Sequence, residues 1–138
     1  MLHHEDTENR KATKSASLMI SYEIIGAAIE VHRLLGPGLL ETVYEGALCK
    51  ELRLRGLIVE RQISIPMSYK GEFLDCFMKL DLLVEHRIIV GVKSVERLVL
   101  VHRAQLLTYL RLQNLWLGLL LNFNVELLRD GVRRVLNG

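Results

Sequence analysis

The sequence has little of what marks a secreted, membrane-spanning or metal-stabilised protein. Its two cysteines, Cys49 and Cys76, lack the spacing of metal ligands, and we expect both to be reduced thiols. The longest apolar run, at residues 115–121, is too short to cross a bilayer. The first 17 residues lack the apolar core of a signal peptide, so we expect a cytoplasmic protein.

Other common sequence signals are absent as well. The chain has no internal repeat, no low-complexity segment in its core and no glycine-rich phosphate loop. Its net charge of +2 does not by itself indicate nucleic-acid binding. What remains is an ordinary globular composition, 50% hydrophobic and 25% charged, over 138 residues. We therefore expect a disordered N-terminal arm at residues 1–17 and a single domain at residues 18–138.

The hydrophobic pattern predicts the order of helices and strands. Two helices are predicted at residues 18–35 and 39–55, separated by Gly36-Pro37-Gly38. Extended segments at residues 57–69, 73–84 and 88–93 are predicted to form an antiparallel meander. A third helix at residues 99–112 leads to a buried strand within 115–121, which favours parallel pairing with an earlier strand. A last hairpin is predicted from residues 125–128 and 132–136. The fold class is therefore α/β, with a mixed β-sheet flanked by helices.

Residues 79–93 hold the most unusual charge, because Asp81 lies inside an apolar strand. Side chains alternate between the two faces of a strand. A three-residue loop, Glu85-His86-Arg87, would place Asp81 opposite Gly91, so that Asp81, Gly91 and Lys93 converge. A loop of even length would separate Asp81 from Lys93. We predict the three-residue loop, because this triplet is the natural polar break, although it contains no glycine.

Three further polar side chains lie beside apolar helix faces, and each has a structural interpretation. Glu41 is an acid in the first turn of a helix, where the helix dipole favours it. We expect His32 to be packed or hydrogen-bonded rather than catalytic. Gln105 lies one turn before Tyr109, and this spacing is compatible both with a solvated boundary position and with an orientation toward the sheet.

A longer pattern resembles a known family. The segment Gly38-Leu39-Leu40-Glu41-Thr42-Val43-Tyr44 looks like the motif that names the GxxExxY proteins, and the likeness extends over nearly the whole chain after the arm. It further includes Val31-His32-Arg33, Gly36-Pro37-Gly38, Asp81-Leu82-Leu83-Val84, Gln105, Tyr109-Leu110, Gly118 and Asn122-Phe123. The GxxExxY family is similar to the PD-(D/E)xK nuclease superfamily. The resemblance implies a restriction-endonuclease-like core of helix, three-stranded meander, helix and strand.

The resemblance also implies roles for individual residues. Asp81 would match the first metal-binding acid, and Lys93 would match the lysine of the motif. Glu41 would match the helical acid that assists metal binding, and Gln105 the polar residue on the following helix. The implied cofactor is Mg²⁺ or Mn²⁺, held by Asp81, Glu41 and the backbone carbonyl of Val92.

The sequence departs from the family pattern on the third strand. Where the pattern has acid-x-Lys, this chain has Gly91-Val92-Lys93, so Gly91 takes the position of the second metal-binding acid. Mg²⁺ binds through several oxygen ligands, commonly carboxylates and water. The change predicts weakened metal binding and impaired or lost phosphodiester hydrolysis. A relocated acid would restore the site, and Glu30, Glu60 and Glu96 are candidates by spacing.

Three functions are compatible with these observations. The first is a nuclease of impaired activity that acts on nucleic acid, DNA rather than RNA. The second is an inactive module that binds phosphates through residues such as Lys93, Arg97, Arg103 and Arg111, with an affinity that falls steeply with salt. The third is a protein-interaction domain or homodimer that uses an exposed apolar patch. None of the three involves a membrane.

Overall fold

The computed structural model describes the backbone of residues 2–138 and the side chains of residues 8–138. Within this part of the chain, one mixed sheet with the strand order β1-β2-β3-β4-β5 is combined with three α-helices and a short 3₁₀ turn. The pairing of β3 with β4 is parallel and the other pairings are antiparallel. The predicted α/β class and mixed sheet are therefore confirmed. The elements are α1 (Leu2–Leu35), α2 (Glu41–Leu54), β1 (Val59–Tyr69), β2 (Glu72–Val84), β3 (Ile88–Lys93), α3 (Leu100–Gln113), β4 (Leu117–Asn122), η1 (Leu128–Gly131) and β5 (Val132–Leu136).

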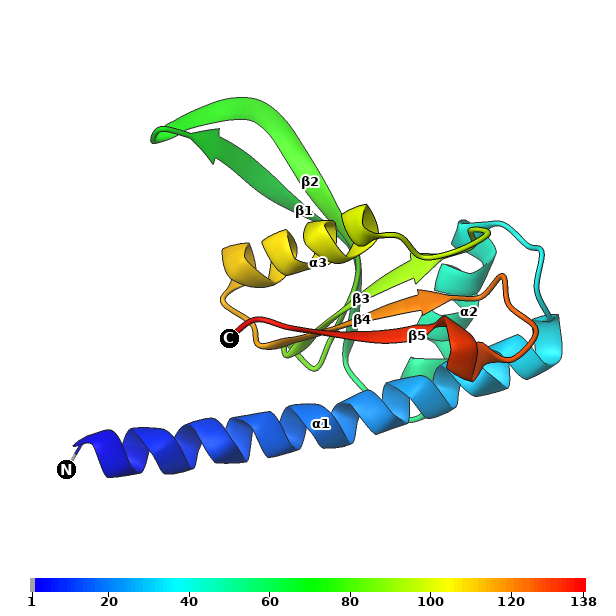
Figure 1. Cartoon of the computed structure of the whole chain (residues 1–138), viewed down its shortest axis with the longest axis horizontal. Coiled ribbons are helices and arrows are strands. Elements are labelled where there is room, and N and C mark those ends of the chain that lie inside the picture. The colour runs from blue at the N-terminus through cyan, green and yellow to red at the C-terminus, as the bar shows by residue number, and fades with distance from the viewer. Residues whose placement is uncertain (1) are drawn as a thin grey trace.

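The sheet separates two apolar cores, with α1 and α2 on one face and α3 on the other (Figure 1). Val90 and Leu119 belong to the core on the α1–α2 face. Ile89 and Leu120 pack with Leu106 of α3 on the opposite face. Strands β3 and β4 thus bury side chains on both faces, which explains why both are continuous apolar runs in the sequence.

The loop between β2 and β3 has the predicted length. Val84 pairs with Ile88, which leaves Glu85-His86-Arg87 as a three-residue loop. Glu85 and His86 have φ angles of 53° and 55°, in the left-handed region that glycine usually occupies. The Glu85 carboxylate accepts a hydrogen bond from the Ile58 N–H at 2.6 Å, and the Glu85 N–H donates to the Ile58 carbonyl at 2.8 Å. These two bonds hold the turn without a glycine.

Strands β1 and β2 continue beyond the rest of the sheet as a two-stranded ribbon that projects past α3 (Figure 1). The pairing of β1 with β2 shifts register between Pro66 and Ser68, next to a proline that has no N–H to donate to the ladder. Cys76 lies exposed on this ribbon and Cys49 is buried in α2, and both are free thiols as predicted. Several apolar side chains near the tip of the ribbon are at least half exposed, namely Tyr69, Phe73, Leu74 and Phe77.

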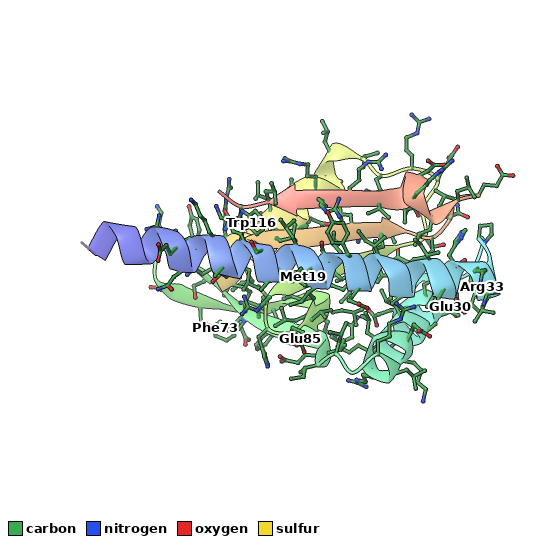
Figure 2. All side chains as sticks on the ribbon, turned by 90° about the horizontal axis from the view of Figure 1, so that it is seen from below. Met19, Glu30, Arg33, Phe73, Glu85 and Trp116 are labelled. Carbon is green, nitrogen blue, oxygen red and sulfur yellow. The ribbon has the colours of Figure 1, made fainter. Side chains whose placement is uncertain are left out.

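Helix α1 is longer than expected. It begins at Leu2, so residues 2–17 are helical where the sequence predicts a disordered arm. This part of α1 extends beyond the sheet (Figures 1 and 2), and the side chains of residues 8–15 are exposed. The Lys14 ammonium lies 5.2 Å from the centre of the Trp116 ring. An exposed helix and a disordered segment are both rich in polar residues. Composition alone therefore does not distinguish one from the other. Among the described residues, no helix has the combined length and apolarity needed to cross a membrane.

The predicted C-terminal hairpin is wrong. Residues 125–127 of the expected first strand form a bend, η1 follows from Leu128, and β5 pairs with β4 instead. The reason lies in the tight return of the chain at Gly131. A Cβ atom added there would lie only 2.1 Å from the Asn122 carbonyl oxygen. Glycine thus lets the chain turn back along β4 and complete the edge of the sheet.

Candidate functional site

The polar residues predicted on β2, β3 and α3 meet at one cavity of about 160 Å³. Asp81 comes from β2, Gly91 and Lys93 from β3, and Gln105 from α3. This convergence agrees with the geometry expected from the three-residue loop. The other lining residues are Lys79, Ile89, Val90, His102, Leu106, Tyr109 and Leu120. Of these, Lys79, His102 and Tyr109 are polar residues to which the sequence analysis assigned no role in the site.

The Asp81 carboxylate binds a backbone group where β2 and β3 separate. The paired residues of this ladder extend from Val84 and Ile88 to Leu82 and Val90. Beyond that last pair, the Val92 N–H donates a hydrogen bond to Asp81 Oδ2 at 2.7 Å. The carboxylate thus provides the acceptor that a strand carbonyl provides elsewhere in the ladder.

The pKa of Asp81 is raised above its ordinary value. Burial of the carboxyl group is the main cause, and the hydrogen bond from Val92 acts in the opposite direction. The nearby carboxylates of α2 raise this pKa further, whereas the Lys93 ammonium lowers it. Burial is also the main reason why the pKa of Tyr109 is raised, followed by the negative charge of Asp81. Asp81 and Tyr109 therefore influence each other electrostatically within the cavity.

Glu41 lies beside the cavity rather than in its lining. It occupies the first turn of α2, and its Oε1 accepts a hydrogen bond from the Ser94 N–H at 3.4 Å. The Ser94 hydroxyl donates to the Leu39 carbonyl just before the helix. These contacts join the start of α2 to the end of β3, next to Lys93. They bring Glu41 near Asp81 without adding a second carboxylate to the cavity.

Tyr44, the last residue of the Gly-x-x-Glu-x-x-Tyr segment, has a structural role. Its ring is fully buried and stacks on Phe123 with ring centres 4.6 Å apart. Its hydroxyl donates to the Gly36 carbonyl and accepts a hydrogen bond from the Leu39 N–H at 3.1 Å. Gly36 and Gly38 have φ angles of 70° and 93°, which favour glycine. Tyr44 therefore fixes the glycine-rich turn that leads into Glu41.

Asn122 positions the segment that follows Lys93. Its buried amide accepts a hydrogen bond from the Val95 N–H and donates one to the Val95 carbonyl, both at 3.0 Å. Asn122 is also the strand partner of Lys93 in the parallel pairing of β3 with β4. In the sequence, Asn122 stands out only through the family likeness, because its role depends on contacts between distant segments.

Gly91 leaves the cavity without a second carboxylate. A Cβ atom added there would lie 3.0 Å from Leu120 Cδ2, so a side chain at position 91 would point toward a residue of the cavity lining. Val92 is not part of that lining, and its side chain packs in the α1–α2 core. Among the described residues, no group of three His, Cys, Asp or Glu side chains is placed to hold a metal ion. The cavity therefore offers a divalent metal fewer carboxylate ligands than a site with two central carboxylates would offer.

None of the three acids that could replace the missing carboxylate lines the cavity. Glu30 forms an ion pair with Arg33 at 2.6 Å on the surface of α1 (Figure 2). Glu60 lies 3.0 Å from the His86 ring. Glu96 is exposed in the segment before α3. The hypothesis of a relocated acid therefore has no geometric basis at these positions.

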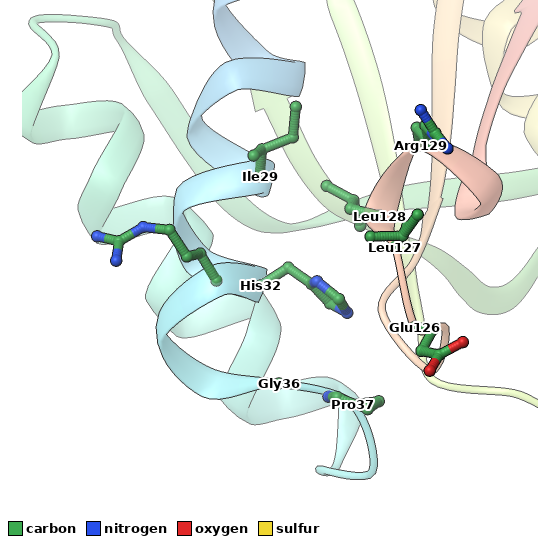
Figure 3. A pocket seen from close by; sticks show the side chains of 9 residues that line it. Ile29, His32, Gly36, Pro37, Glu126, Leu127, Leu128 and Arg129 are labelled. Carbon is green, nitrogen blue, oxygen red and sulfur yellow. The ribbon is translucent and has the colours of Figure 1, made fainter.

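A larger hollow of about 570 Å³ lies between the C-terminal end of α1 and η1 (Figure 3). His32 is buried at this hollow, and its Nε2 lies 2.7 Å from the Val125 carbonyl oxygen. That contact joins α1 to the segment before η1, in agreement with the structural role expected for His32. Arg33 also lines the hollow, but it is paired with Glu30. The hollow is separate from the cavity that holds Asp81.

Comparison with known families agrees with this arrangement. The family model of the PD-(D/E)XK nuclease superfamily matches residues 19–135. The chain belongs to the PD-(D/E)XK nuclease superfamily. No curated protein and no solved structure matches the chain closely enough to refine this assignment. Nucleases of this superfamily generally use divalent metals. In this PD-(D/E)XK domain, Gly91 contributes no side chain to the cavity that Asp81 and Lys93 line.

The raised pKa of Asp81 predicts how the stability of this PD-(D/E)XK domain depends on pH. The folded state binds the proton more strongly than the unfolded chain, whose aspartates titrate at about 3.9. Stability should therefore be lost as the pH rises from that value through the folded pKa. Asp81→Asn removes this titration, so the variant should gain stability relative to the parent as the pH rises above the ordinary aspartate value. Urea denaturation at each pH measures the difference. The exposed Asp75→Asn variant controls for the change of charge, and an equal trend in both variants would contradict the prediction.

Proposed function

We propose that this chain is a nucleic-acid-binding PD-(D/E)XK domain whose metal-dependent phosphodiester hydrolysis is impaired or lost. The observation that carries the proposal is the cavity lined by Asp81, Lys93 and Gln105, with Gly91 at the position that the family likeness assigns to a second acid. The Gly38 to Tyr44 segment supports assignment to the GxxExxY group within the superfamily. The preference for DNA over RNA and the cytoplasmic location stay predictions.

The two faces of the sheet differ in how their positive charges are compensated. On the α1–α2 face, arginines form ion pairs with acids of the two helices at 2.6–2.9 Å. From residue 97 to residue 125, a stretch that includes α3 and β4, the chain contains no Asp or Glu. Arg97, Arg103 and Arg111 are exposed in this acid-free stretch. The ion pairs of the first face are Arg33 with Glu30, Arg55 with Glu51, and Arg61 with Glu45.

Two of these arginines lie on α3, the helix that forms one wall of the cavity. Arg103 and Arg111 belong to α3, which also provides Gln105 and Tyr109 to the cavity lining. Arg103 further lines a shallow hollow with Arg133 of β5. A nucleic acid that placed one phosphate at the cavity would therefore meet these guanidinium groups with its neighbouring phosphates. Such contacts fix position and provide affinity without reading the base sequence.

Replacing Arg103 and Arg111 together by Gln should weaken binding to nucleic acid. The slope of log affinity against log salt should fall by about 0.9 for each phosphate that the variant no longer neutralises. Fluorescence anisotropy with labelled single-stranded and double-stranded DNA and RNA over a salt series measures both quantities. The control variant, Arg33→Gln with Lys50→Gln, removes the same charge from the α1–α2 face. Equal weakening in both variants would indicate a net-charge effect, and salt-independent binding by the parent would contradict phosphate contacts.

Restoring an acid at position 91 should restore metal binding. We expect Gly91→Glu to bind Mg²⁺ or Mn²⁺ about 10-fold or more tightly than the parent, because even residues behind the ligands change metal affinity by that amount. Isothermal titration calorimetry measures this affinity. Gly91→Gln is the matched control, since both side chains displace Leu120 in the same way and only one carries a carboxylate.

Cleavage of DNA and RNA by the same two variants tests the impaired chemistry. Gly91→Glu should cleave faster than the parent, and adding Asp81→Asn should abolish the gain. Equal metal affinity in the Glu and Gln variants would show that position 91 does not face a metal site. A parent that cleaves as fast as Gly91→Glu, and loses this activity with Asp81→Asn, would overturn the proposed loss of catalysis.

The exposed ribbon supports a second candidate function, association with a protein partner or with a second copy of the chain. Phe73 and Phe77 meet edge to face with ring centres 5.6 Å apart, and both are more than half exposed. Exposed apolar clusters often mark association surfaces. If the chain is a homodimer through this ribbon, Phe73→Ser with Phe77→Ser should convert it to a monomer in sedimentation equilibrium. Leu54→Ser with Ile58→Ser, two exposed positions away from the ribbon, should leave the mass unchanged, and a monomeric parent would remove self-association through the ribbon as a candidate.

A further inference from the structure

The cavity contains more positive than negative groups. Lys79 and Lys93 both line it, whereas Asp81 is the one carboxylate among its lining residues in the described part of the chain. Glu41 lies outside the lining, and Glu45 is held by Arg61 at 2.8 Å and by Gln62 at 2.6 Å. Among the lining side chains the positive charge therefore exceeds the negative charge, which favours an anion there, while Glu41 and Glu45 act on Asp81 from outside the lining.

His102 adds a hydrogen-bond donor with a defined orientation. Its Nδ1 accepts a hydrogen bond from the Val99 N–H at 3.0 Å, at the start of α3. In the neutral ring this bond assigns the proton to Nε2, the nitrogen that remains free to donate. Gln105 lies one turn further along α3 and has two amide hydrogens to donate. The wall of the cavity formed by α3 therefore presents donors, while the β2 and β3 walls present the two lysines.

We propose that this cavity binds one phosphate group directly through Lys79, Lys93, His102 and Gln105, without a bridging metal ion. The inference extends the proposed function, because the phosphate would belong to the nucleic acid, either at a strand end or within the backbone. Lys79 and His102 thereby receive roles that the family likeness did not give them. Phosphate oxygens accept hydrogen bonds from ammonium, imidazole and amide groups, and charged acceptors make such bonds stronger than neutral ones.

The size and the donors of the cavity fit this ligand. A volume of about 160 Å³ is suited to a single phosphate-sized group rather than to a whole nucleotide. The bare backbone at Gly91 keeps one side of the cavity free of a carboxylate that would repel the anion. The carboxylate that is present, Asp81, already accepts the Val92 N–H through one oxygen.

The direct test is titration of the full chain with inorganic phosphate in EDTA at constant ionic strength. Calorimetry gives the affinity, and the ¹⁵N chemical shift of the His102 ring nitrogen Nε2 reports contact at the cavity. Lys79→Met and His102→Asn should each weaken phosphate binding about 10-fold or more. Asn at position 102 keeps an acceptor near the Val99 N–H but lacks the atom that reaches the cavity. Lys50→Met on α2 is the matched control and should bind phosphate as the parent does.

A second arm distinguishes the two sources of phosphate. An oligonucleotide with a 5′-phosphate should bind more tightly than the same strand with a 5′-hydroxyl if the cavity holds a strand end. If the two oligonucleotides bind equally and Lys79→Met still weakens their binding, the cavity holds a phosphate of the backbone. The proposal is overturned if inorganic phosphate fails to bind in EDTA, if it leaves the His102 shift unchanged, or if Lys79→Met behaves like Lys50→Met.

The same measurements separate this inference from the proposed function. One outcome is that replacing Arg103 and Arg111 removes the salt-dependent binding of nucleic acid while Lys79→Met and His102→Asn leave it unchanged. That result overturns the phosphate site in the cavity and keeps the nucleic-acid function. Binding of inorganic phosphate at the cavity, in a chain that binds no DNA or RNA, overturns the nucleic-acid function and with it the assignment of the phosphate to nucleic acid.

Discussion

The structure of the site depends on the point where β2 separates from β3. Two strands that separate inside a protein leave backbone groups without partners, and buried groups of this kind need a replacement. Here the Asp81 carboxylate accepts the Val92 N–H at 2.7 Å just beyond the last ladder pair. A charged group in an apolar strand is costly unless it is hydrogen-bonded, and this bond offsets part of that cost. The separation that requires Asp81 also opens the cavity beneath α3, so the acid and the cavity have a common structural origin.

The neighbouring strand β1 adapts at the same level of the sheet. Gln62 lies between the residues of β1 that pair with Leu82 and Leu80, and its φ angle of 54° is unusual for a residue with a side chain. The Gln62 amide donates to the buried carboxylate of Glu45 at 2.6 Å, and Arg61 donates to the other oxygen at 2.8 Å. Helix α2 thus anchors the irregular part of β1 opposite Asp81. Breaks in strand regularity of this kind concentrate next to functional sites.

The sequence was most informative where a few neighbouring residues decide the geometry. The convergence of Asp81, Gly91 and Lys93 followed from counting residues across one polar triplet, because strand side chains alternate strictly. The position of His102 in the cavity could not be predicted from the sequence, because helical spacing does not define which side of α3 faces the sheet. Gly118 contributes to that choice, because a Cβ atom there would lie 2.9 Å from Leu106 of α3. The absence of Asp and Glu from residue 97 to residue 125 is visible in the sequence. Its consequence for binding depends on where α3 lies in the fold.

Long-range contacts explain the remaining differences between expectation and structure. The pairing of β5 with β4 depends on the close approach of Gly131 to Asn122, which no local pattern in residues 125–136 reveals. Tyr44 shows the same limit, because its spacing within the motif gives no sign that its hydroxyl closes the turn at Gly36. Its buried ring and two hydrogen bonds identify it as the support of Glu41, not as part of the chemistry.

A carboxylate at position 91 would change the preferred ligand of the cavity as well as its metal affinity. A divalent cation is bound well where negative groups exceed positive ones, and an acid at position 91 would balance Lys79 and Lys93 against two carboxylates. Without that acid, the lining contains two lysines and the carboxylate of Asp81. Charges placed around a small cavity act strongly because the surrounding protein screens them less than water does. Glycine at position 91 thus offers neither a metal ligand nor a group that would repel a phosphate, so this one position bears on both kinds of ligand.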